Sequence, residues 1–65
     1  MEIGTVKWFD AHRGFGFIGR DGASDVFVHA AEVEAPRVLA PGDRVCFEVG
    51  EGPRGLLARR VRLAS

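Results

Sequence analysis

The sequence predicts a small all-β protein whose five strands form a closed or nearly closed barrel. Nine glycines and three prolines interrupt the chain every few residues, so no segment keeps a helical period for three turns. The runs between them are short and rich in Val, Ile, Phe, Trp and Thr, which is typical of strands. Closure into a barrel would remove the exposed edges of so small a sheet.

The strands are expected at residues 3–9, 14–19, 25–29, 44–49 and 56–63. Asp21-Gly22, between the second and third strands, is typical of a hairpin turn. The one long connection, residues 30–43, has room for a helical turn at residues 30–33. Pro36 and Pro41 prevent that turn from continuing.

Strand alternation places the side chains of each strand on two faces. The aliphatic faces form the predicted core, which contains Ile18, Val26, Val28, Val45, Phe47 and Val49. The opposite face of the second and third strands carries Phe15, Phe17, Phe27 and His29. We expect Lys7, Trp8 and Phe9 of the first strand to extend this aromatic patch.

An exposed aromatic patch can stack on unpaired bases, at roughly 1–3 kcal/mol per base and with little regard for sequence. A duplex offers no free base faces, so the expected partner is single-stranded RNA or DNA, and no residue selects between the two. One alternative is that the phenylalanines belong to the core, where such side chains are usually found. Another is a barrel used for protein–protein contact, through the same patch and Leu56-Leu57.

Length and composition exclude several other classes of protein. A chain of 65 residues forms one domain, and it has neither an apolar run that could span a membrane nor a secretory signal. The single cysteine, Cys46, favours a reducing cytoplasm. The spacing of His12, His29 and Cys46 matches no zinc motif. We expect no enzymatic activity, no cofactor and no metal, and a monomer or a weak dimer.

The net charge is zero, with three bases and five acids in residues 1–32 and six bases and four acids in residues 33–65. The patch lies in the acidic half, so binding should depend mainly on stacking and neutralise about two to four phosphates. Arg59, Arg60 and Arg62 form either a solvated strand face or an electrostatic supplement to binding.

Three stretches closely resemble the signature of the cold-shock domain family: residues 6–9 (Val-Lys-Trp-Phe), 14–18 (Gly-Phe-Gly-Phe-Ile) and 25–29 (Asp-Val-Phe-Val-His). The resemblance continues through Pro41-Gly42 to Arg54-Gly55 and covers nearly the whole chain. It implies one domain, residues 1–65, folded as a five-stranded antiparallel OB-fold barrel that binds single-stranded nucleic acid. The single-domain bacterial members imply an RNA chaperone that melts RNA secondary structure and affects transcription and translation.

The resemblance also implies a set of binding residues: Lys7, Trp8, Phe9, Phe15, Phe17, Phe27 and His29, and more weakly Asp10, Arg13, Asp21 and Arg54. The chain departs from the family at two positions near this set: Asp10 replaces the usual Asn, and Ala30 replaces a common Phe. Residues 34–39 lack the usual loop aromatic, and Leu56-Leu57 replaces Pro-Gln. With fewer stacking positions, we expect weaker binding on a shorter footprint.

Overall fold

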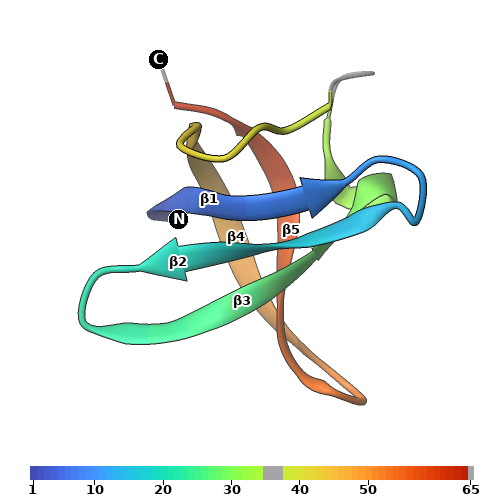
Figure 1. Cartoon of the computed structure of the whole chain (residues 1–65). Coiled ribbons are helices and arrows are strands. Elements are labelled where there is room, and N and C mark those ends of the chain that lie inside the picture. Colours follow the sequence, from blue (N-terminus) through green and yellow to red (C-terminus); the bar gives the residue numbers. More distant parts are fainter. Residues whose placement is uncertain (35–37, 65) are drawn as a thin grey trace.

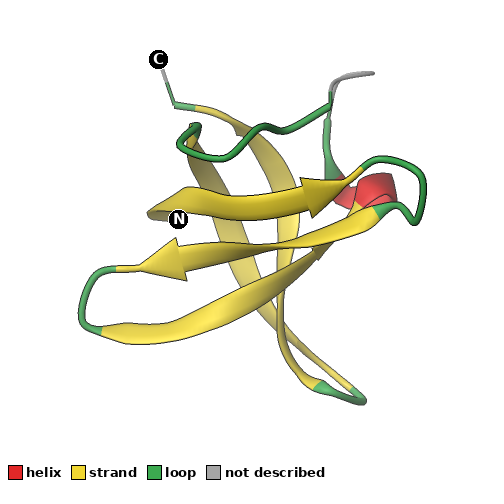
Figure 2. Cartoon of the chain, in the orientation of Figure 1, coloured by secondary structure: helices red, strands yellow, loops and turns green. Residues whose placement is uncertain are grey.

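The strands close into a barrel in the order β1-β2-β3-β5-β4 (Figure 1). The computed structural model describes residues 1–34 and 38–64. Within these residues the elements are β1 (Glu2–Asp10), β2 (Phe15–Arg20), β3 (Ala23–His29), the short 3-10 helix η1 (Ala30–Glu32), β4 (Arg44–Gly52) and β5 (Gly55–Leu63). Strands make up most of the chain, with loops at both ends of the barrel (Figure 2). In the described residues no helix is long and apolar enough to cross a membrane.

The predicted five-stranded barrel is confirmed, and the pairing that closes it adds a detail. β1 pairs antiparallel with both β2 and β4, and β3 and β5 continue this alternation on either side. An odd number of alternating strands must place two parallel strands together at the point of closure. These are β3 and β5, which pair at Phe27 with Leu57 and at Val28 with Ala58.

The long connection begins with the predicted helical turn, which is the 3-10 helix η1. The His29 side chain caps this turn, because its Nδ1 accepts a hydrogen bond from the Ala31 N–H at 3.1 Å. Residues 35–37 lie outside the described residues, and with them Pro36 and part of the segment that lacks the family's loop aromatic.

The core agrees closely with the prediction from strand alternation. Among the described residues the buried side chains are Val6, Ile18, Val26, Val28, Leu39, Val45, Phe47, Ala58 and Val61. Val49 is half-buried against them. Val6, Ala58 and Val61 of β1 and β5 were not part of the predicted core, and neither was Leu39, which comes from the long connection, where no strand period marks an inward-facing residue.

A bulge in β1 decides which aromatic side chains face outward. The pairing with β2 shifts between Val6 and Trp8, so that Lys7 is the extra residue on β1. Beyond the bulge the alternation is reversed: Lys7 and Trp8 are both exposed, while Phe9 packs against the core. Phe9 therefore does not extend the aromatic patch as expected.

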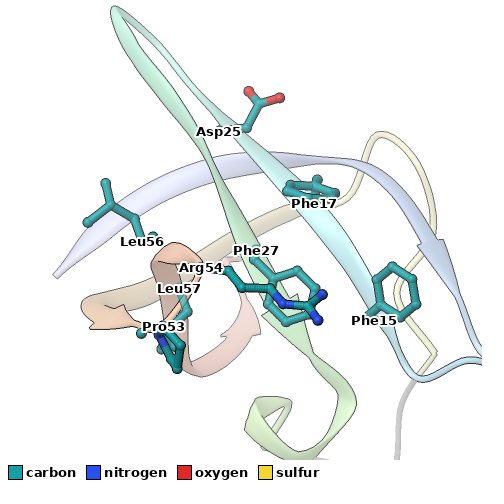
Figure 3. A pocket seen from close by; sticks show the side chains of 10 residues that line it. Phe15, Phe17, Asp25, Phe27, Pro53, Arg54, Leu56 and Leu57 are labelled. Carbon is teal, nitrogen blue, oxygen red and sulfur yellow. The ribbon is translucent and has the colours of Figure 1, made fainter.

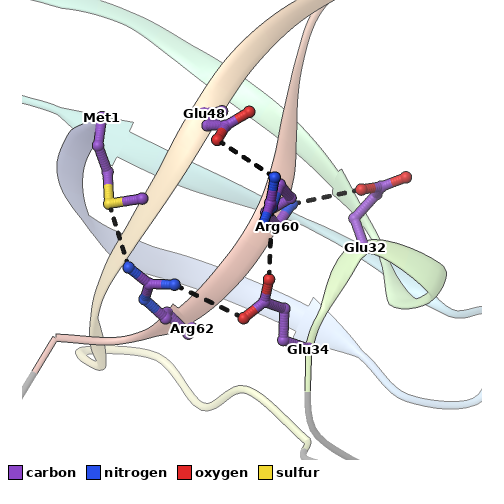
Figure 4. Close-up of polar contacts among 6 residues, drawn as sticks. All are labelled: Met1, Glu32, Glu34, Glu48, Arg60 and Arg62. Atoms are coloured by element: carbon purple, nitrogen blue, oxygen red, sulfur yellow. Dashed lines mark hydrogen bonds and ion pairs between the residues drawn. The ribbon is translucent and has the colours of Figure 1, made fainter.

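A second bulge lies on β5, where Arg60 has a left-handed backbone conformation with φ 55°. The pairing with β4 shifts there, so that two residues of β5 face one of β4. The Arg60 guanidinium lies 3.6 Å from a Glu34 carboxylate oxygen and 3.9 Å from one of Glu48 (Figure 4). The backbone N–H of Arg60 donates a hydrogen bond to the Glu32 carboxylate. These contacts tie the start of the long connection to β5.

Candidate nucleic-acid interface

Four aromatic rings lie together on the outer face of β1, β2 and β3. They belong to Trp8, Phe15, Phe17 and Phe27, and we call them the aromatic cluster. Trp8 is 41% exposed and the three phenylalanines are half-buried. The centroid distances are 5.6 Å for Trp8–Phe15, 5.5 Å for Trp8–Phe17, 5.6 Å for Phe15–Phe27 and 5.7 Å for Phe17–Phe27. The rings therefore form one continuous apolar surface.

Strand pairing positions each member of the aromatic cluster. Phe17 lies opposite Trp8 on one side and Phe27 on the other, and Phe15 lies opposite His29. Gly16, between the two phenylalanines of β2, allows β1 to approach closely. A methyl group on its Cα would lie 2.7 Å from the Phe9 Cα. The alternation of Gly and Phe thus turns the rings outward and keeps the backbone close to the core.

A groove of about 510 Å³ runs between the aromatic cluster and the hairpin that joins β4 to β5. Phe15, Phe17 and Phe27 form one wall, and Pro53, Arg54 and Leu57 belong to the other (Figure 3). Asp25, which precedes Phe27 on the same face of β3, also lines the groove. The walls are mainly apolar, and the charged side chains of Asp25 and Arg54 lie among them.

His29 continues the aromatic surface at the end of β3. Its Nδ1 accepts the Ala31 N–H, which assigns the ring proton of the neutral imidazole to Nε2. The exposed side of the ring can therefore stack and donate one hydrogen bond to a base edge. Ala30 follows it and supplies no further ring.

Several cations near the cluster are engaged by carboxylates. The Lys7 Nζ lies 3.0 Å from Asp25, with its side chain across Gly19, where a methyl group would lie 3.1 Å from the Lys7 Cε. Arg13 Nε lies 3.9 Å from Asp10 Oδ2. Arg20 is only 12% exposed in its ion pair with Glu2. Lys7 and Arg13 stay accessible to a ligand, whereas Arg20 does not.

Asp10 also holds the turn between β1 and β2. Its Oδ1 accepts the backbone N–H groups of His12 at 3.0 Å and Arg13 at 3.1 Å. An asparagine Oδ1 could accept the same two hydrogen bonds, so the usual family residue and Asp10 fit this turn equally well. They differ in the negative charge that Asp10 adds beside Phe15, its partner on β2.

The structure brings most of the expected site residues together. Trp8, Phe15, Phe17, Phe27 and His29 form one surface, with Lys7 and Arg54 at its edge. Asp10 and Arg13 lie at the adjoining turn, and Phe9 packs against the core. Asp21 lies in the turn between β2 and β3 and does not line the groove.

Asp25 and Pro53 are among the groove residues that sequence reasoning missed. Asp25 shares its face of β3 with Phe27, so strand alternation could have found it. Pro53 comes from the β4–β5 hairpin, and only the three-dimensional fold brings that hairpin opposite the aromatic cluster.

On the far side of β5, Arg62 lies 3.7 Å from Glu34 and beside Cys46. The Cys46 sulfur and then the Glu34 carboxylate raise the pKa of Arg62 above its usual value. Arg60 and Arg62 thus form ion pairs between β5 and Glu34, which lies shortly after η1 (Figure 4).

Comparison with known proteins gives a consistent result. The family model described as "'Cold-shock' DNA-binding domain" matches residues 2–64. Cold shock protein CspC of Bacillus subtilis is 47% identical over 66 residues, which cover 98% of this chain and 100% of that protein. Probable cold shock protein A of Mycolicibacterium smegmatis is 51% identical over 65 residues, which cover 95% of this chain and 97% of that protein.

Among solved structures, drosophila Unr CSD456 matches with a TM-score of 0.80 and 29% identity. The match covers 98% of this chain and 26% of the chain in that structure, so this chain spans about a quarter of the length of the one it matches. Family model, relatives and barrel agree over nearly the whole sequence. The chain therefore belongs to the cold-shock DNA-binding domain family, a family of nucleic-acid-binding proteins.

Proposed function

We propose that this protein binds single-stranded RNA or DNA by stacking bases on the aromatic cluster, and that it acts as an RNA chaperone. One observation carries the proposal. The barrel fills its core with other side chains, yet four large rings lie side by side on its outer face. Exposing so much aromatic surface has a cost in water, and stacking on unpaired bases offsets that cost.

The energy of stacking explains how such a surface could melt RNA. A stacked base is worth roughly 1–3 kcal/mol, whereas a base-pair step in a DNA duplex contributes on average about 1.4 kcal/mol. Capture of a few unpaired bases therefore competes with re-formation of a short hairpin. It does not compete with a long duplex, whose many steps add up to more than the cluster can offset.

The experiment that tests the proposal is a titration with a short oligothymidine followed by Trp8 fluorescence. Trp8 is itself a member of the aromatic cluster, so a base stacked on it should quench its emission. Phe15→Ala and Phe27→Ala should each weaken binding by about 5- to 150-fold, which corresponds to one lost stack. Matched RNA and DNA heptamers would show which nucleic acid is preferred.

Ile3→Ala is the matched control, because Ile3 is a large hydrophobic side chain that is 55% exposed on β1 and lies outside the cluster and the groove. Its affinity should equal that of the unchanged protein. Absence of quenching at micromolar protein, or equal losses in all three variants, would refute base stacking. Chaperone activity is tested separately by the opening of a fluorophore-labelled RNA hairpin.

The apolar groove also fits a second function, in which the barrel binds a partner protein. Leu57 and Pro53 give the groove an apolar wall without ring faces. Native electrophoresis with single-stranded oligonucleotides separates the two functions, because only nucleic-acid binding shifts the oligonucleotide band. Size-exclusion chromatography tests the expected monomer.

A further inference from the structure

The groove continues past the aromatic cluster into a second hollow of about 150 Å³. Phe27 and Leu57 line both spaces, because they are partners in the parallel pairing of β3 with β5. His29 of β3 and Arg59 of β5 both line the second hollow. A strand that stacks on Phe27 and His29 therefore has a continuous path onto the outer face of β5.

Arg59 is the cation on this path. Ala58 is buried, so alternation turns both Leu57 and Arg59 toward the outer face of β5. The Arg59 side chain lies over Gly50 of β4, where a methyl group would be 2.9 Å from the Arg59 Nε and 3.3 Å from its Cδ. Gly50 thus provides the space that keeps this side chain along the barrel surface.

The ion pairs of β5 distinguish Arg59 from its neighbours. Arg60 and Arg62 both pair with Glu34. Within residues 1–34 and 38–64, no carboxylate oxygen lies within 4.0 Å of the Arg59 guanidinium. Glu32 also lines the second hollow, but its Oε1 already accepts a hydrogen bond from the backbone N–H of Arg60 at 3.3 Å.

We propose that Arg59 binds a backbone phosphate of the strand whose bases stack on Phe27 and His29. The strand then crosses from the β2–β3 hairpin to β5, with Arg54 at the first space and Arg59 at the second. This inference rests on the proposed function, and it adds a residue and a direction to the binding path. Arg60 and Arg62 keep their structural ion pairs and take no part.

The test compares Arg59→Gln with Arg62→Gln, which makes the same change of charge on the same strand. Binding of a single-stranded heptamer is measured over a series of salt concentrations by Trp8 fluorescence. Loss of one phosphate contact lowers the slope of log K against log salt by about 0.7. At about 0.1 M salt this corresponds to an affinity loss of about fivefold, whereas Arg62→Gln leaves slope and affinity unchanged.

A third variant, Gly50→Ala, displaces the Arg59 side chain without changing any charge, and it should lower the affinity in the same direction. If Arg59→Gln does not fold, the affinity measured with Gly50→Ala still tests the inference. Equal salt slopes in Arg59→Gln and Arg62→Gln, together with unchanged binding by Gly50→Ala, would overturn the role of Arg59 alone. If the unchanged protein binds no single strand, the proposed function itself is wrong.

Discussion

Replacing Asp10 by Asn should strengthen binding of single-stranded nucleic acid without disturbing the fold. The Asp10 Oδ1 accepts two backbone N–H groups, and an amide oxygen can keep both hydrogen bonds. The substitution removes only the negative charge and the ion pair with Arg13. Arg13, whose side chain is 74% exposed, then becomes available to a phosphate next to Phe15.

The size of this effect follows from the geometry. Two unit charges 3.9 Å apart in a water-like dielectric interact by about 1 kcal/mol, and exposed pairs rarely exceed that value. Release of Arg13 for one additional phosphate contact should therefore raise the affinity by about fivefold. The slope of log K against log salt should steepen by about 0.7. The unfolding temperature should change by less than about 5 °C.

Asp43→Asn is the matched control for this experiment. Asp43 also accepts a backbone hydrogen bond, from the Ala40 N–H at 3.0 Å, but it lies in the turn before β4 and does not line the groove. Fluorescence titration of both variants separates a local effect from a change in net charge. Equal gains in the two variants, or no gain for Asp10→Asn, would refute the local role of Asp10.

Three further predictions concern the stability of the barrel, and the first also concerns its separation from binding. Phe47→Leu in the core should lower the unfolding temperature by up to about 10 °C and leave the affinity of the folded protein unchanged. Phe27→Leu should lower the affinity and leave the unfolding temperature unchanged. Parallel losses in both quantities would contradict a separate binding surface. Gly16→Ala should lower the unfolding temperature by roughly 15 °C, because the added methyl group would clash with the Trp8 carbonyl oxygen. An unchanged unfolding temperature would show that β1 can move away from β2. Arg60→Gly should unfold about 7 °C above Arg60→Ala by circular dichroism, because a left-handed backbone costs a non-glycine residue about 1 kcal/mol, and the opposite order would count against strain at this bulge.

Local sequence signals predicted the features of this fold that depend on neighbouring residues. Glycine and proline positions indicated the strand ends to within three residues, although β4 continues through Gly50 to Gly52, and Asp21-Gly22 indicated the β2–β3 turn. Alternation gave the inward positions of Ile18, Val26 and Val28, because the period of two holds in residues 15–18 and 26–29, on one side of the register shift between Ile18 and Arg20. These signals act over a few residues, so a single sequence is enough to reveal them.

The bulges could not be predicted in the same way. Nothing in the composition around Lys7 marks it as the extra residue of β1, and the shift reverses the faces of Trp8 and Phe9. The same holds for Arg60, whose contact with Glu32 joins positions far apart in the chain. Such features depend on the register between strands, which only the folded barrel determines.

The distribution of ion pairs explains how a protein without net charge can hold a polyanion. Lys7 and Arg13 each have a carboxylate partner, so contact with a phosphate gives them little additional electrostatic energy. Arg54 and Arg59 line the path and, within the described part of the chain, form no ion pair. Two such contacts give a slope of log K against log salt of about 1.4 in magnitude, at the shallow end of the expected range. A slope near 2.8 would mean that Lys7 and Arg13 also leave their carboxylates for the strand, and stacking would then contribute a smaller share of the affinity.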